Sequence, residues 1–515
     1  MSDIDSSFLN PADMKLKIAA KGVLIGLITG LLVVLYRLGI EFGYESAIKT
    51  FSYMKEQPLI IIPWIVLAIV VGLGISALVK WEPMAAGSGI PQVEGQLLLG
   101  LKMKWLSIIV VRYIAGLLSS FLGVSLGREG PSIQIGASGS QFIAKKISRN
   151  KLEENYLITG GAAAGLSAAF NAPLSGIVFV LEEVHRSFSP LILITATTAS
   201  LTADIVSKYF FGLTPILNFR SLPQLPELHY LLLIPLGLIA GLAGVFLNKA
   251  LLKFQLLYAK LPSKLRPIIA LLLALPCGLL LPAVLGGGQN LVRLAENTNN
   301  GIPFLLILIA VKLLFTCTSF GSGLPGGIFM PILSIGALTG SLFGVVCTYF
   351  GLSAAYIPDF AICGMAAALS STVKAPITSI LLTAEMTGSL VHLLPVAACS
   401  FIALFLSDIL KTMPIYEVLL ERIIEGNGET IKNDKIGGIV EIPVELGCKV
   451  ANKKIADINW PSGAFIVSLR RGNKDITPNP NTVISQGDYL TLMSSEASYG
   501  ELNALIRDLC HTKSG

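Results

Sequence analysis

The sequence predicts an all-α polytopic membrane protein with broken helices, followed by a small soluble α+β domain. Three observations predict this fold class. The 515-residue chain is 53% hydrophobic and only 14% charged, whereas soluble domains average about 25% charged residues. Its hydrophobic segments are interrupted by glycine and proline, and they repeat in two halves. After about Thr430 the composition becomes polar, and the hydrophobic runs shorten to the length of strands.

The hydrophobic segments of the first 410 residues are expected to form helices that cross or enter the bilayer. Several are shorter than the roughly 20 residues that a spanning helix needs. Glycine and proline clusters separate them, and broken helices at membrane depth are tolerated only where they line a cavity or are buried in protein. This pattern favours a transporter or channel core over simple membrane anchors. The segments are 18–47, 59–80, 105–122, 131–147, 155–170, 174–186, 190–211, 228–256, 265–285, 303–319, 328–350, 355–371, 376–387 and 391–410.

Charged residues near these segments predict how the chain lies in the membrane. Residues 1–13 are polar and lead directly into a long hydrophobic segment, so we expect no removable signal peptide. Lys15, Lys17 and Lys21 flank that segment and predict a cytoplasmic N-terminus. The basic stretch Lys145–Lys151 predicts a cytoplasmic loop, and a solvated loop on either side is the alternative. The net charge of +6 is too modest to indicate binding to a nucleic acid polymer.

Cysteine and histidine are used sparingly. The seven cysteines are an odd number with no C-x-x-C spacing, and there are only four histidines. This usage supports neither a disulfide framework nor a metal cluster. We therefore expect no bound metal.

An internal repeat divides the hydrophobic part of the chain into two halves. Residues 161–183 match residues 364–386 without a gap, and residues 127–137 match residues 327–337. Each match places a proline at the same point of two broken helices. Transporters with internal repeats show this pattern and bind their substrate at the repeat interface near the midplane. An odd number of crossings in each half would invert one copy relative to the other. The repeats cover about residues 15–211 and 228–410.

The stretch Gly123–Ala137 carries the strongest chemical signal. It reads G-V-S-L-G-R-E-G-P-S-I-Q-I-G-A, which places Arg128 and Glu129 between glycines with Pro131 next. Proline suits the first turn of a helix, and the glycines leave the N–H groups of the helix start open to an anion. An ionised group at bilayer depth costs several kcal/mol, so Glu129 marks a pathway or a relay. The alternative is a salt bridge between Glu129 and Arg128 in a re-entrant loop.

Three further segments could complete one anion site. G-S-G-I-P at residues 87–91 offers the hydroxyl of Ser88 at a second helix start, and G-G-I-F-M-P at residues 326–331 repeats the opening motif without its acid. Tyr416 offers a phenolic hydroxyl. Hydroxyl and N–H donors suit a weakly basic anion, because full positive charges would hold it too tightly for transit. Taken singly, Ser88 and Tyr416 are more often capping or packing residues.

In this order and spacing, these segments resemble the CLC family of chloride channels and proton-coupled chloride exchangers, over roughly residues 15–425. The resemblance implies a homodimer in the plasma (inner) membrane, in which each subunit has one anion pathway built from two inverted repeats. A serine at this place in G-S-G-I-P, with G-R-E-G-P intact, favours chloride over nitrate and fluoride. The resemblance implies that chloride is coordinated by Ser88 and Tyr416 and by backbone amides around Gly130, Ile328 and Phe329.

The same resemblance assigns roles to three acids. Glu129 would be the gate and the outer proton acceptor, because its ionised form competes with chloride and its neutral form can leave the anion path. Glu183 falls where exchangers of the family have an internal proton-transfer glutamate, and Glu94 resembles a supporting acid. An interfacial Glu183 that faces the cytosol is the alternative. We predict an antiporter that exchanges chloride for protons.

Two other functions compete with this prediction. The first is a passive chloride channel of the same fold, from which proton flux would distinguish an antiporter. The second is an intramembrane enzyme that uses Glu129 or Glu183 with Tyr416. The enzyme lacks a nucleophile–base pair or a metal-ligand set at a workable spacing, so we expect no enzymatic activity.

The last part of the chain predicts a second domain. We place the membrane domain at residues 1–430, with Tyr416 on a short final helix, and a cytoplasmic regulatory domain at 434–515. Ala464–Leu469 and Tyr489–Met493 predict strands, and Ser498–Cys510 predicts an amphipathic helix. With Gly487-Asp488 before a strand and a hairpin turn at Arg470-Arg471-Gly472, the domain resembles the TrkA-C type (RCK C-terminal) module of bacterial potassium-uptake regulators. That resemblance implies a bacterial source and regulation by cyclic di-AMP, and a stabilising dimerisation tail is the alternative.

Overall fold

The computed structural model describes residues 11–149, 151–186, 188–217, 219, 225–426, 438–444, 450–460, 464–471, 474–485 and 487–494. Within these residues the chain divides into two compact units. The first runs to Val93 and continues from Met103 to Leu419. The second combines Glu94–Lys102 with the residues from Leu420 onward.

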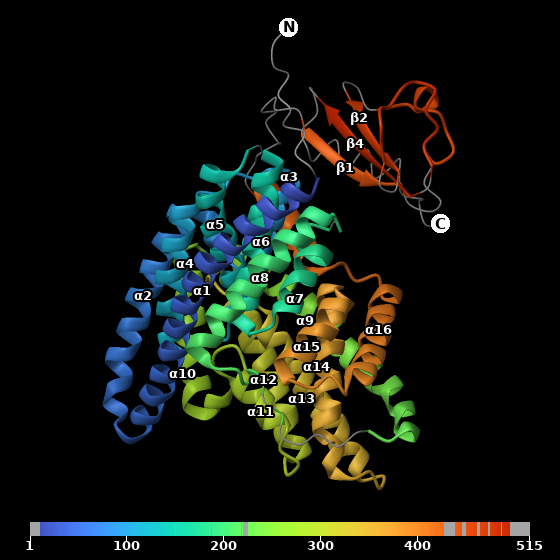
Figure 1. The fold of residues 1–515 in the computed structure, drawn as a ribbon. Coiled ribbons are helices and arrows are strands. Elements are labelled where there is room, and N and C mark those ends of the chain that lie inside the picture. Colours follow the sequence, from blue (N-terminus) through green and yellow to red (C-terminus); the bar gives the residue numbers. More distant parts are fainter. Residues whose placement is uncertain are drawn as a thin grey trace. The chain divides into compact units, whose positions relative to one another are not determined.

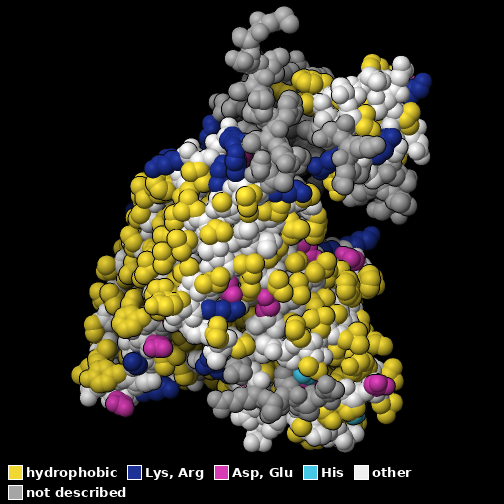
Figure 2. Space-filling view, in the orientation of Figure 1, with side chains coloured by type: hydrophobic (Ala, Val, Ile, Leu, Met, Phe, Trp, Pro, Cys, Tyr) yellow, Lys and Arg dark blue, Asp and Glu magenta, His cyan; other side chains and the backbone are white. Residues whose placement is uncertain are grey.

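Helices account for almost all of the chain up to Gly426 (Figure 1). Seven of the described helices are long and apolar enough to cross a membrane. Figure 2 shows hydrophobic side chains over most of the visible face of the helical unit, as a lipid-facing surface requires. The helices are α1 (Pro11–Glu56), α2 (Ile61–Trp81), α3 (Ile90–Leu99), α4 (Trp105–Phe121), α5 (Glu129–Ile147), α6 (Lys151–Phe170), α7 (Pro173–Phe179), the π-helix η3 (Val180–Val184), α8 (Pro190–Phe211), α9 (Leu233–Ala259), α10 (Leu265–Leu280), α11 (Gln289–Ala295), α12 (Ile302–Gly321), α13 (Phe329–Thr348), α14 (Ile357–Val373), α15 (Pro376–Thr387), α16 (Leu393–Ile409) and α17 (Ile415–Gly426).

The helix boundaries follow the breaks in the sequence. Pro173 and Pro376 stand at the first positions of α7 and α15, where a missing N–H costs nothing. α1 runs on to Glu56, past the hydrophobic segment that ends at residue 47, because neither glycine nor proline interrupts the chain between residue 47 and Pro58. The predicted all-helical membrane part with broken helices is confirmed.

The two halves of the helical unit pack their helices in the same way. In the first half α5 packs on α6, and α8 packs on both α1 and α6. In the second half α13 packs on α14, and α16 packs on both α9 and α14. Glycines permit the closest crossings: a Cβ at Gly136 would overlap the carbonyl oxygen of Gly161, and a Cβ at Gly336 would overlap that of Gly364. The sequence repeat therefore corresponds to a structural repeat.

Reciprocal hydrogen bonds join the two halves. The N–H of Gly127 donates to the carbonyl oxygen of Gly327, and the N–H of Gly327 donates to that of Gly127, both at 2.7 Å. This antiparallel pair connects the loops that precede α5 and α13. The matching bonds indicate a pseudo-two-fold relation between the halves.

Two glutamates cap helices across the same boundary. The Glu182 carboxylate, in η3, accepts hydrogen bonds of 2.7–3.2 Å from two backbone N–H groups at the start of α15 and from the Thr378 hydroxyl. The Glu385 carboxylate, near the end of α15, accepts bonds of 2.5–3.0 Å from two N–H groups at the start of α7 and from the Ser175 hydroxyl. Each half therefore supplies the acid that satisfies a helix start of the other.

The second unit contains a four-stranded antiparallel sheet of order β1-β4-β2-β3. Both strands predicted from the sequence are confirmed, as parts of β2 and β4. The predicted helix at Ser498–Cys510 lies outside the described residues. The core under the sheet includes Leu469 and Leu490, both fully buried. The strands are β1 (Gly438–Pro443), β2 (Ala464–Arg471), β3 (Lys474–Ile476) and β4 (Asp488–Ser494).

A buried carboxylate ties β2 to β4 and supports a first prediction. Asp488 is fully buried and receives two hydrogen bonds of 2.8 Å from the Arg471 guanidinium and one of 2.7 Å from the Ser485 N–H. Burial alone would raise the pKa of Asp488, but these bonds hold it below its usual value. A depressed pKa stabilises the fold above the unfolded-state pKa of about 3.9, and this stability is lost as the pH falls further.

We therefore expect Asp488→Asn to destabilise the sheet by about 1–3 kcal/mol at pH 7. The difference from wild type should shrink below about pH 4, where the unfolded carboxyl is protonated. Hydrogen exchange of the β2 and β4 amides in the full-length protein measures both effects, and Asp457→Asn, at an exposed site, is the control. Equal protection in Asp488→Asn and wild type at pH 7 would contradict the prediction.

Candidate functional site

The segments singled out in the sequence meet inside the helical unit. The paired loops before α5 and α13 bring the starts of these two helices together. The Phe329 ring, at the start of α13, stacks on the Tyr416 ring with centroids 6.0 Å apart. Tyr416 lies within electrostatic reach of Ser88, Glu129 and Glu183. Five of the predicted site residues thus come from five segments that are far apart in the sequence: the loop before α3, α5, η3, α13 and α17.

The Ser88 loop touches the start of α5 directly. A Cβ at Gly130 would lie 2.6 Å from the Ser88 hydroxyl oxygen and would overlap its carbonyl oxygen. Gly87 and Gly89 on either side have φ angles of 62° and 98°, which other residues adopt only with strain. The glycines of G-S-G-I-P and G-R-E-G-P are therefore required by this close approach.

Gly130→Ala is expected to reduce transport by about 10-fold or more, because the added methyl pushes the Ser88 loop out of position. The measurement is chloride efflux from liposomes that contain equal amounts of purified protein. Gly74→Ala on α2, where a Cβ would meet nothing within 4 Å, is the matched control. If the efflux of Gly130→Ala equals that of the control, the close approach of the Ser88 loop to Gly130 does not affect transport.

Two buried hydroxyls at the site, those of Ser88 and Tyr416, face one another. Ser88 and Tyr416 are 2% and 0% exposed, and neither hydroxyl oxygen has a well-formed hydrogen bond within the described part of the chain. Buried polar groups are nearly always paired, so such a pair calls for an explanation. Two donors that approach one another from α17 and the α3 start are suited to hold an anion between them.

The Glu129 carboxylate lies at the starts of both α5 and α13. The side chain is 1% exposed and faces the backbone N–H groups of Arg128, Glu129 itself and Met330. A Cβ at Gly127 would overlap its Oε2 atom, so the glycine makes room for the acid. The carboxylate therefore lies beside the helix-start N–H groups, and its Oε2 atom has no well-formed hydrogen bond in the described part of the chain.

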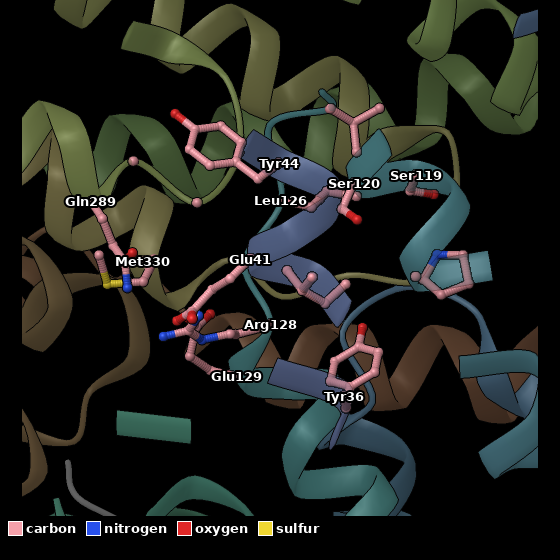
Figure 3. A pocket seen from close by; sticks show the side chains of 18 residues that line it. Tyr36, Glu41, Tyr44, Ser119, Ser120, Leu126, Arg128, Glu129, Gln289 and Met330 are labelled. Atoms are coloured by element: carbon pink, nitrogen blue, oxygen red, sulfur yellow. The ribbon is translucent and has the colours of Figure 1, made fainter. Parts of the chain in front are cut away.

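Arg128 does not pair with this acid. Its Nη1 atom lies 2.5 Å from Oε1 of Glu41 on α1, and Figure 3 shows this pair beside Glu129 on one side of a pocket. The sequence alternative of a salt bridge between Glu129 and Arg128 is wrong, because the guanidinium has a carboxylate partner on another helix.

Glu183 lies in η3, the π-helix that continues α7. It is 4% exposed, and Arg186 approaches it with Nη2 3.9 Å from Oε1. Arg186 also lies 3.6 Å from Glu417, the residue after Tyr416. Single π-helical turns are frequent at functional sites. Glu94 is buried on α3, in the part of that helix that belongs to the second compact unit.

Sequence analysis does not single out three other charged residues near this site. Arg112 is fully buried and donates to Gly87 O at 2.6 Å and to Gln134 Oε1 at 2.5 Å, so it holds the Ser88 loop. Lys312 is fully buried and donates to two backbone carbonyls. Glu41 is the third. A charged residue inside an apolar segment is the signal that could have identified each of them.

Comparison with known proteins identifies the family. The family model described as voltage gated chloride channel matches residues 70–408. The chain belongs to this CLC family. It is 34% identical over 413 residues to the H(+)/Cl(-) exchange transporter ClcA of Yersinia pseudotuberculosis, which covers 77% of this chain and 86% of that relative. The ClcA protein of Salmonella paratyphi A is 33% identical over 421 residues, or 79% of this chain and 89% of the relative.

Solved structures agree with this membership of the CLC family. A slow cyanobacterial Cl−/H+ antiporter superposes with a TM-score of 0.73 at 30% identity and covers 79% of this chain and 98% of its own. A CLC-type fluoride/proton antiporter superposes with a TM-score of 0.65 at 23% identity, over 78% of this chain and 97% of its own, and shows the fold alone. The TrkA-C domain model matches residues 439–507. Both family resemblances noted in the sequence are confirmed, and the chain is a multi-pass membrane transporter rather than an enzyme.

Within the described residues, no group of three or more His, Cys, Asp or Glu side chains is arranged to hold a metal ion. The site therefore consists of hydroxyls, backbone N–H groups and two buried acids. Such a set can bind an anion and can bind protons.

Proposed function

We propose that this protein is a secondary active antiporter that exchanges chloride for protons across the membrane. The observation that carries the proposal is the place of the Glu129 carboxylate, among the N–H groups at the starts of α5 and α13. A carboxylate in that place competes with any other anion for the same donors. The names of the ClcA relatives and of the cyanobacterial antiporter support the choice of chloride and protons.

The mechanism couples the two ions by mutual exclusion. Chloride would be held by the Ser88 and Tyr416 hydroxyls and by the amides near Gly130, Ile328 and Phe329. Ionised Glu129 blocks this place. Once Glu129 is protonated it is neutral, so it loses its attraction to the helix starts and gives way to chloride.

Protons need a second acid on the inner side. Glu183 is the proposed internal proton-transfer site, with Glu94 in a supporting role. Tyr416 is within electrostatic reach of both Glu129 and Glu183, so one residue of the anion site lies near both acids. In the proposed mechanism the proton passes between the two acids while chloride moves the other way.

The proposal also covers the oligomeric state of the protein, its orientation in the membrane and its regulatory ligand. We infer a homodimer in the plasma membrane, as the CLC family resemblance implies. We place both termini in the cytoplasm, with the N-terminus assigned from the basic residues that flank the start of α1 and the α5–α6 loop. Cyclic di-AMP is proposed as a regulatory ligand of the TrkA-C domain. Calorimetric titration of the full-length protein with this nucleotide tests that part, and the absence of heat would refute it.

Proton uptake into liposomes, driven only by a chloride gradient, tests the exchange itself. Wild-type protein should move protons against their own gradient, and Glu183→Gln should lose this movement while chloride still flows. Chloride flux without proton movement in wild type would make the protein a passive channel. In that case Glu183 would have no role in transport.

A further inference from the structure

A cation next to a mobile acid creates a problem for the proposed gate. Arg128 immediately precedes Glu129, and a carboxylate with an arginine within about 4–6 Å is strongly held in its ionised form. An acid trapped in this way would rarely take up a proton. The structure contains a competing carboxylate that pairs with the Arg128 guanidinium, while Arg128 stays within electrostatic reach of Glu129.

Glu41 on α1 binds the Arg128 guanidinium. Its Oε1 atom lies 2.5 Å from Nη1, and Nη2 reaches the carbonyl oxygen of Ala169 at 3.5 Å. The Nε atom of Arg128 is buried without a hydrogen-bond partner in the described part of the chain. The guanidinium therefore keeps a free donor with which it could bind a second carboxylate.

The Glu41 side chain is fixed from its other side. Arg37, one turn earlier on α1, donates from Nε to the same Oε1 atom at 3.1 Å. Arg37 is itself anchored by Asn171 at 2.8 Å and lies 3.6 Å above the centre of the Phe211 ring. Because Asn171, just after α6, and Phe211, on α8, both hold Arg37, Glu41 has little freedom to turn away from Arg128.

Glu41, Arg128 and Glu129 line one pocket (Figure 3). With a cytoplasmic N-terminus, the second half of α1 lies toward the outer side of the membrane, so this pocket is the outer approach to Glu129. The Glu41 side chain is 35% exposed, whereas that of Arg128 is 5% exposed. The pair thus stands between outside water and the proposed gate.

We propose that Glu41 is a positioning residue that holds Arg128 away from Glu129, so that Glu129 can take up a proton from the outer side and leave the anion site. This inference rests on the proposed role of Glu129. It concerns how readily the Glu129 side chain takes up a proton and moves, and it assigns Glu41 no contact with chloride.

The other charged and titratable groups near Glu129 do not replace Arg128 as the cation that would bind this acid. Those within electrostatic reach are Tyr36 on α1, Arg128 at the start of α5, Lys312 on α12 and Tyr416 on α17. Lys312 is held by the carbonyl oxygens of Val284 and Gly286 at 3.1 and 2.7 Å. Lys312 is thus held by backbone groups, which a substitution does not remove. Arg128 is held by the side chain of Glu41, so a substitution of Glu41 can release it.

Chloride efflux from liposomes as a function of external pH tests the proposal. In Glu41→Gln, Arg128 should turn to Glu129, and the midpoint of the pH dependence should fall by about one unit, which is a tenfold higher proton activity. Glu45→Gln removes the same charge one turn further along α1 at an exposed site and should leave the midpoint unchanged. Glu41→Asp keeps the charge with a shorter reach and should give a smaller shift, so it serves as the test if Glu41→Gln does not fold.

A double substitution separates this route from a general charge effect. In an Arg128→Gln background, Glu41→Gln should cause no further shift, because the cation that it releases is absent. A midpoint that does not move in Glu41→Gln, or a shift that persists without Arg128, would overturn the proposal. The effect of Glu41 is measured by chloride efflux, and the exchange function is tested by proton movement. A wild-type protein that moves no protons would refute the exchange function, and the effect of Glu41 on efflux could still be measured.

Discussion

Glu129→Gln is expected to abolish chloride-driven proton uptake while chloride flux continues. Glutamine has nearly the shape of the protonated acid but takes up no proton, so the proposed exchange loses its proposed outer proton acceptor. The N–H groups that now face the carboxylate remain in place and are open to chloride. Proton uptake should fall by roughly 100-fold or more, in the range typical for the loss of a proton-transfer group. Chloride flux should also lose its dependence on external pH.

Glu56→Gln, at the exposed end of α1, is the control for the loss of one carboxylate. The experiment uses the liposome assay with a chloride gradient and a pH-sensitive dye outside the vesicles. Persistent proton uptake in Glu129→Gln would mean that another group accepts the outer proton. The place of Glu129 at the two helix starts would then be structural.

The double substitution Glu182→Ala with Glu385→Ala is expected to cause the largest loss of stability. Each glutamate accepts two backbone N–H bonds and one hydroxyl bond from the opposite half of the helical unit. Hydrogen bonds to a charged group contribute about 1.5–3 kcal/mol, and an acid at a helix start contributes further through the helix dipole. Removal of one cap should cost about 2 kcal/mol, and removal of both about twice that.

Thermal unfolding in detergent, followed by tryptophan fluorescence, measures this loss. The helical unit contains Trp64, Trp81 and Trp105 as probes. The single variants should lower the midpoint by similar amounts, since the two caps have the same geometry. Glu56→Ala is the control. Equal midpoints in wild type and the double variant would show that water satisfies the helix starts equally well.

The sequence predicts the parts of the site that are encoded locally. Ser88, Glu129 and Phe329 each stand at a glycine-rich helix start, and such starts can be recognised from a few neighbouring residues. The repeat could be predicted for the same reason, because its two copies align without a gap. The convergence of these segments with Tyr416 was expected because each offers N–H or hydroxyl donors suited to an anion, and the family resemblance then implied the role of each residue.

The partners of the charged residues could not be predicted. Arg128 has an acid beside it in the sequence, yet it binds Glu41, which lies 87 residues away. The repeat aligns Glu182 with Glu385, but nothing in the alignment indicates that each one caps a helix of the opposite half. Which partner a charged side chain binds depends on how whole helices pack against one another. The local sequence pattern carries no information about this packing. The same limit applies to β1 and β3, which were not predicted from the sequence.

The exchanged caps have a consequence for the biosynthesis of the chain. When the first half has left the ribosome, the start of α7 has no acceptor for its free N–H groups, because Glu385 has not yet been made. The first half therefore waits in the membrane in an incomplete form until α15 is inserted, and only then can both halves lock together. Two separately translated halves should accordingly assemble when they are made in the same cell, while either half made alone should be a target for membrane proteases.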